Sequence, residues 1–167
     1  MMGGKSEKKQ NWGIKEVDLV LEELQNKGVI KPLGKLLYDE YSLPCLGLKN
    51  NQLFDSDRAV KVIGKEDAIF SIFIEVDKAG SADHNVIKYL PYILGNIEKI
   101  NYQHIFLLHI LGDVFLNNNL VSSRRLAKYY GQYAIPQLFP KFHYEQSEPM
   151  HKEQISGWLR EKFSKIL

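Results

Sequence analysis

The sequence has very little cysteine and no long apolar run. Cys45 is the only cysteine among 167 residues, which rules out an internal disulfide and fits a reducing, cytoplasmic setting. No stretch approaches the about 18 uncharged apolar residues that a bilayer-spanning helix needs, so we expect no membrane segment. The net charge is only +2, so any binding of nucleic acid must depend on a local basic patch.

Several familiar motifs of enzymes are also absent. The sequence contains no P-loop, no G-x-G-x-x-G, no G-x-S-x-G and no spacing typical of zinc ligands. Nucleotide hydrolysis on a glycine-rich loop, dinucleotide redox chemistry and serine-esterase chemistry therefore have no support. Any chemistry must come from residues that the fold brings together.

The composition is that of one globular domain, with 44% hydrophobic and 25% charged residues. Residues 1–12 are polar and rich in lysine, and we expect a flexible leader there. Residues 13–167 should form a single α/β domain, in which 120–167 extend the core.

The spacing of apolar residues predicts a mixed β-sheet flanked by helices. A helix over 83–99, starting at Ser81 or Asp83 and kinked at Pro91, separates a three-stranded meander from a later strand that should run parallel to its neighbour. The segment 133–144 should be extended but irregular. The other predicted helices are 14–27, 32–41, 121–130 and 152–167, and the predicted strands are 45–48, 59–63, 68–76 and 104–111.

Acidic residues gather where the longest apolar strand ends. The strand 68–76 is apolar enough to be buried on both faces, yet Glu75, Asp77 and Lys78 stand at its end. A hairpin with its turn near 65–66 would place Asp57 across from Ile74 or Glu75. Such crowded carboxylates repel one another unless they hold a divalent cation, Mg²⁺ or Mn²⁺, which can activate water for hydrolysis of a phosphodiester. The alternative is that these residues only mark a turn and the exit of a strand.

Ile74-Glu75-Val76-Asp77-Lys78, with Asp57 or Asp55 upstream, resembles the signature of the PD-(D/E)xK nuclease superfamily, the restriction-endonuclease-like proteins. The resemblance covers about residues 14–112. That family has a core of a helix, a three-strand meander, a helix and a further strand, with an Asp on the second strand and (D/E)-x-K on the third. The resemblance therefore implies a magnesium-dependent DNA endonuclease that acts as a homodimer.

The resemblance also implies roles for individual residues. Asp57 and Glu75 would be metal ligands, and Asp77 would orient the attacking water or assist a second metal. The family's lysine position is occupied here by Asp77, and Lys78 follows one residue later on the other face. The family often adds an acid from the first helix, for which Glu22, Glu23 and Glu40 are available. The misplaced lysine favours an alternative, a catalytically inactive module on the same fold that binds nucleic acid or protein.

Other cations can contact a nucleic acid. Lys78 and Lys88 flank the carboxylates and are placed to contact the scissile phosphate. The basic segment at 124–128, with Arg124, Arg125 and Lys128 beside stackable tyrosines, predicts a local nucleic-acid surface. Packing of the tyrosines in the core or at an interface is the alternative. His104 and His109 should face opposite sides of one strand, and we interpret both as structural.

Overall fold

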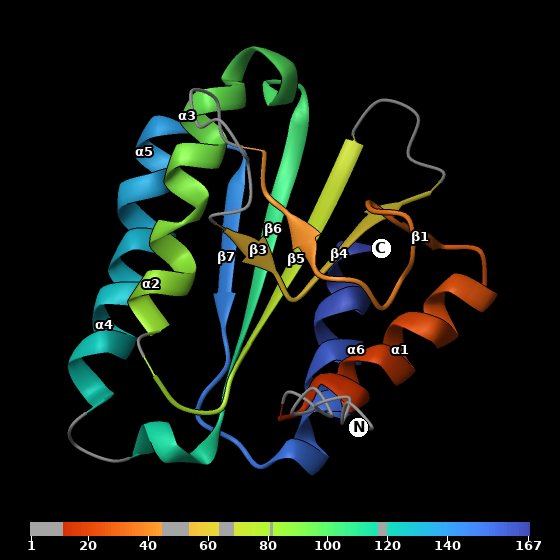
Figure 1. The fold of residues 1–167 in the computed structure, drawn as a ribbon, viewed down its shortest axis with the longest axis vertical. Helices are drawn as coiled ribbons and strands as arrows, with labels where there is room; N and C mark the ends of the chain where they lie inside the picture. Colours follow the sequence, from red (N-terminus) through yellow and green to blue (C-terminus); the bar gives the residue numbers. More distant parts are fainter. Residues whose placement is uncertain (1–11, 45–53, 64–68, 81, 117–119) are drawn as a thin grey trace, which may run out of the picture.

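The computed structural model describes residues 12–44, 54–63, 69–80, 82–116 and 120–167 (Figure 1). The predicted strand 45–48 lies wholly outside these ranges. The predicted leader 1–12 also lies outside them, except for Trp12. The elements alternate as expected for an α/β protein. In chain order they are α1 (Ile14–Asn26), β1 (Ile30–Pro32), β2 (Tyr41–Ser42), β3 (Asp55–Ser56), β4 (Arg58–Val62), β5 (Ile69–Asp77), α2 (Ala82–Ile87), α3 (Tyr89–Ile100), β6 (Gln103–Leu111), the 3₁₀ turn η1 (Asp113–Leu116), α4 (Val121–Tyr129), the π-helical turn η3 (Tyr130–Ala134), α5 (Ile135–Leu138), β7 (Phe142–Gln146), the 3₁₀ turn η4 (Lys152–Gln154) and α6 (Ile155–Ile166).

The main sheet has five strands in the order β1-β4-β5-β6-β7. β1, β4 and β5 are antiparallel neighbours, whereas β6 runs parallel to β5 and β7 parallel to β6. The predicted parallel strand is confirmed, because α2 and α3 cross over between β5 and β6. A separate ribbon of β2 and β3 pairs Ser42 with Asp55.

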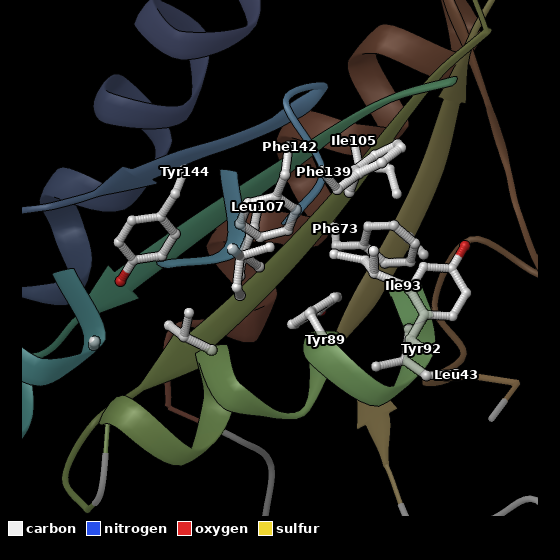
Figure 2. Close-up of a cluster of buried hydrophobic side chains, with 14 of the residues drawn as sticks. Leu43, Phe73, Tyr89, Tyr92, Ile93, Ile105, Leu107, Phe139, Phe142 and Tyr144 are labelled. Atoms are coloured by element: carbon white, nitrogen blue, oxygen red, sulfur yellow. The ribbon is translucent and has the colours of Figure 1, made fainter. Parts of the chain in front are cut away.

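Helices cover both faces of the sheet, with α2 to α5 on one side and α1 with α6 on the other (Figure 1). Successive residues of β5 enter two different cores, because side chains alternate along a strand. Phe73 packs beneath α3 with Tyr89 and Tyr92, as Figure 2 shows. Ile72 and Ile74 pack against α1 and α6. The predicted burial of this strand on both faces is confirmed.

Two predicted segments differ from the structure. The helix expected over 32–41 is wrong: Pro32 ends strand β1, residues 33–39 form bends and turns, and Tyr41 begins strand β2. The segment 133–144 is not irregular throughout, because it contains the end of η3, α5 and the start of β7. Pro136 stands in the first turn of α5, directly after the π-helical turn η3.

Pro91 divides the predicted long helix, as expected. α2 ends at Ile87 and α3 begins at Tyr89. A proline at 91 cannot donate to the carbonyl of residue 87, which breaks the ladder at this point. The break lies beside Lys88, whose side chain enters the site described next.

Candidate active site at the end of β5

An open cleft of about 450 Å³ lies where β5 ends and faces the start of β4 and helix α2. The three predicted ligands Asp57, Glu75 and Asp77 all line it. The other residues around it are Trp12, Glu40, Asp55, Val76, Lys78, Ala79, Asn85 and Lys88. The structure therefore brings together the carboxylates that are separated in the sequence.

Asp57 reaches the cleft because β4 and β5 pair in one of the two predicted registers. Arg58 faces Ile74 across the ladder, so residue 57 lies beside the end of β5. Its Oδ2 accepts a hydrogen bond of 2.8 Å from the backbone N–H of Val76. Burial raises the pKa of Asp57, while the Val76 N–H and the Lys88 ammonium act in the opposite direction.

Glu75 is the most deeply buried carboxylate of the cleft, with 2% of its surface exposed. Its Oε2 accepts a bond of 2.7 Å from Lys88 Nζ, and its Oε1 accepts one from the hydroxyl of Tyr89. Burial raises the pKa of Glu75 to about 8 and outweighs the lowering by Lys88. Only a nearby cation makes the ionised form of this side chain tolerable.

Asp77 is held through both of its oxygens. Asn85 donates to Oδ1 at 2.6 Å, and His109 contacts Oδ2 at 2.7 Å through Nε2. Period-2 alternation turns Asp77 to the same side of β5 as Glu75, as predicted. His109 is completely buried on the adjacent strand β6, directly across the ladder from Glu75.

Lys88 is the cation that contacts these carboxylates. It is 8% exposed, and besides Glu75 its Nζ donates to the backbone carbonyl of Asp55 at 2.6 Å and to Asn85 Oδ1 at 3.1 Å. Lys78 also lines the cleft but is exposed. The lysine predicted to touch phosphate from a helix is therefore the one that contacts the buried Glu75 carboxyl group.

The structure separates the other acidic candidates. Both Asp55 and Asp57 line the cleft, but the Asp55 carboxylate accepts a bond from Ser42 in the β2–β3 ribbon. Glu40 lines the cleft and raises the pKa of Asp57. Glu23 instead pairs with Lys27 and with α6, away from the site. Glu40 reaches the cleft from the segment before β2, so it is not the acid of the first helix that the resemblance implies.

The donor set suits a hard divalent cation, because carboxylate oxygens are the ligands that Mg²⁺ and Mn²⁺ prefer. In the described part of the chain, however, no three acidic or histidine side chains converge closely enough to hold a metal as they stand. Lys88 Nζ already contacts Glu75. Metal binding by Asp57, Glu75 and Asp77 would therefore require this ammonium to move.

The predicted nucleic-acid surface lies on α4 and η3. Tyr129 and Tyr133 are 57% and 59% exposed and stack on each other with ring centres 6.2 Å apart. These tyrosines are thus on the surface, not in the core. Three cations of the same helix accompany them: Arg124, Arg125 and Lys128.

Four residues contact the predicted site residues although no motif in the sequence points to them: Asn85, Tyr89, His109 and Tyr144. The structural role predicted for His109 is incomplete, because it contacts Asp77 at one nitrogen and the Tyr144 hydroxyl at the other. The predicted separation of His104 from His109 does hold, because His104 instead stacks on Phe70 and His143. The sequence does predict that the strand at 104–111 runs parallel to its neighbour. Aligning that strand with β5 residue by residue is the signal that places His109 beside Glu75.

Comparisons of the chain with protein-family models, with curated proteins and with solved structures find no match. Within the ranges that the structure describes, no helix combines the length and the apolar character needed to cross a bilayer. The function must therefore be argued from the cleft itself.

Proposed function

We propose that this protein is a metal-dependent DNA endonuclease with a restriction-endonuclease-like fold. The observation that carries the proposal is the gathering of Asp57, Glu75 and Asp77 in one cleft, with the Lys88 ammonium 2.7 Å from Glu75. The order of elements supports it: a helix, three antiparallel strands, a helical crossover and a parallel strand. This order is similar to the core that the sequence resemblance implies, with the β2–β3 ribbon inserted between β1 and β4.

Asp57 and Glu75 would hold Mg²⁺ or Mn²⁺. The bound cation would supply an activated water and neutralise charge on the phosphate. Asp77, whose oxygens contact Asn85 and His109, would be a further ligand of the cation and would orient the attacking water. The Lys88 ammonium, once it leaves Glu75, would pair with a phosphate oxygen. The Tyr89 hydroxyl keeps the Glu75 carboxylate in place.

The surface of α4 and η3 provides contacts to DNA in this proposal. Arg124, Arg125 and Lys128 bind backbone phosphates, and the exposed tyrosines offer faces on which unpaired bases can stack. A bond between Ser123 and Asp83 joins α4 to α2, the helix that borders the cleft. One molecule with one cleft cuts one strand, so we extend the proposal to a homodimer.

The test is cleavage of supercoiled plasmid by the purified protein. We expect nicking with Mn²⁺ or Mg²⁺ and none with EDTA. Glu75→Gln should keep its circular-dichroism spectrum and lose cleavage, because an amide is a poor metal ligand. The exposed Glu98→Gln is the matched control and should cut normally. A folded wild-type protein that nicks no DNA form with either ion would overturn the enzymatic proposal.

A second function is favoured by the contact of Lys88 Nζ with Glu75, a predicted metal ligand. The presence of Asp77 at the family's lysine position favours it as well. A protein that had lost cleavage could keep its carboxylates neutralised in this way and still bind DNA. Such a module would retard DNA in a gel, release it as salt is raised, and cut it with no divalent ion. Replacing Arg124 and Arg125 by alanine should weaken binding in either case.

A further inference from the structure

A line of hydrogen bonds runs from the edge strand β7 to the cleft. Gln146 Nε2 lies 3.0 Å from the Tyr144 hydroxyl, which lies 2.8 Å from His109 Nδ1. His109 Nε2 lies 2.7 Å from Asp77 Oδ2. Four side chains on three adjacent strands are thus connected, and the last of them is a predicted ligand.

The chemistry of the two ends fixes the direction of these bonds. The Gln146 amide nitrogen can only donate, and the Asp77 carboxylate accepts. The Tyr144 oxygen accepts from Gln146, so its own proton is available for His109 Nδ1. His109 then carries its proton on Nε2 and donates it to Asp77. The imidazole has one tautomer and one orientation in this arrangement.

The protein packs tightly around the middle of this line. A Cβ at position 131 would overlap the ring of Tyr144, so only glycine leaves room for the ring there. Tyr144 is buried, and His109 is fully buried beneath it. A buried polar group that is fixed by packing and bonded at each end has little freedom to turn. Figure 2 shows Tyr144 at one end of the core cluster and Tyr92 at the other.

We propose that His109 is a positioning residue: held by Tyr144 and Gln146, it orients Asp77 for binding of a divalent cation in the cleft. This inference rests on the proposed function and deepens it. Partners that orient metal ligands typically change affinity by about 10-fold to 100-fold when they are removed. His109 does not line the cleft, so it acts on a bound cation through Asp77.

The experiment measures the affinity of purified protein for Mn²⁺ by electron paramagnetic resonance, without DNA. Tyr144→Phe should weaken Mn²⁺ binding by about 10-fold, and His109→Leu by up to about 100-fold. His109→Gln keeps a donor and an acceptor and should recover part of the loss. Tyr92→Phe removes a hydroxyl from the same core outside this line of bonds, and its affinity should stay at the wild-type value.

A spectroscopic signature accompanies the affinities. The ¹⁵N shifts of His109 should report a proton on Nε2, and a proton on Nδ1 alone would overturn the proposal. If wild type binds Mn²⁺ and nicks DNA while folded Tyr144→Phe binds Mn²⁺ equally well, the positioning role is refuted and the nuclease proposal stands. If wild type binds no Mn²⁺, the metal site fails and the role of His109 fails with it.

Discussion

Replacing Glu75 by glutamine should remove a steep pH dependence of folding stability. In the folded protein burial raises the pKa of Glu75 to about 8 from its ordinary value of 4.5. As pH rises from 4.5 to 8 the unfolded chain loses this proton, while the folded protein keeps it. The folded state therefore binds more protons in this window, and the free energy of unfolding falls as pH rises.

The size of the effect follows from the same values. One pH unit between folded and unfolded pKa corresponds to about 1.36 kcal/mol, so the shift from 4.5 to about 8 corresponds to about 5 kcal/mol. This contribution is complete below pH 4.5 and is lost as pH rises through 8. Glutamine mimics the protonated carboxyl, so Glu75→Gln should become more stable than wild type as the solution turns alkaline.

The assay is urea unfolding followed by circular dichroism, in EDTA, at pH values from 5 to 9. Wild type should lose about 4 kcal/mol more than Glu75→Gln between pH 5 and pH 8 and little more above it. Because Asp57 also has a raised pKa, only the difference between the two proteins isolates Glu75. Two parallel stability profiles would refute the reasoning, since Glu75 would then titrate as an exposed carboxyl. The exposed Glu98→Gln should follow wild type.

Divalent cations provide an independent check of the same residue. A metal binds the ionised carboxylate and displaces its proton, so binding should strengthen as pH rises. Saturating Mn²⁺ should therefore raise the stability of wild type more at pH 8.5 than at pH 6. Glu75→Gln should gain little at either pH. An equal gain at both pH values would show that Mn²⁺ binds elsewhere.

Two further substitutions test the packing around the site. Gly131→Ala should displace the Tyr144 ring and lower stability by about 1–3 kcal/mol in thermal unfolding, whereas Gly157→Ala, with open space around it, should be neutral or stabilising. Arg58 donates to both oxygens of Asp18 and is buried beside the cleft. Arg58→Leu should cost about 3 kcal/mol in urea unfolding, because it leaves the Asp18 carboxylate unpaired, and a loss below about 1 kcal/mol would contradict this account.

Much of the sheet could be predicted from residue spacing. The apolar run of β5 requires burial on both faces, and its end in Glu75 and Asp77 locates the site. The turn position predicted between β4 and β5 allows two registers for the pairing of these strands. The observed register brings Asp57 beside Val76. Each of these conclusions depends on residues that are close in sequence, whose geometry is set by the period of a strand.

The segment from 32 to 41 shows where local patterns were insufficient. Its leucines have a spacing compatible with a helix, yet Ile30–Pro32 pairs with β4. The pairing of β1 with β4, and the bond from the Leu33 N–H to the Ala59 carbonyl, satisfy the backbone there and override a weak helical preference. Nothing in the local residues encodes the position of the sheet edge.

The sequence by itself determined that β5 would be buried and that acidic side chains would cluster where it ends, because alternation and hydrophobicity act along one strand. Only the tertiary structure decided which cation contacts those acids and which neighbouring side chains form hydrogen bonds with them. Lys88 comes from the break between α2 and α3, Asn85 from α2, and His109 from a strand placed by a crossover. Side-chain contacts between such distant segments depend on the packing of layers, which no local period specifies.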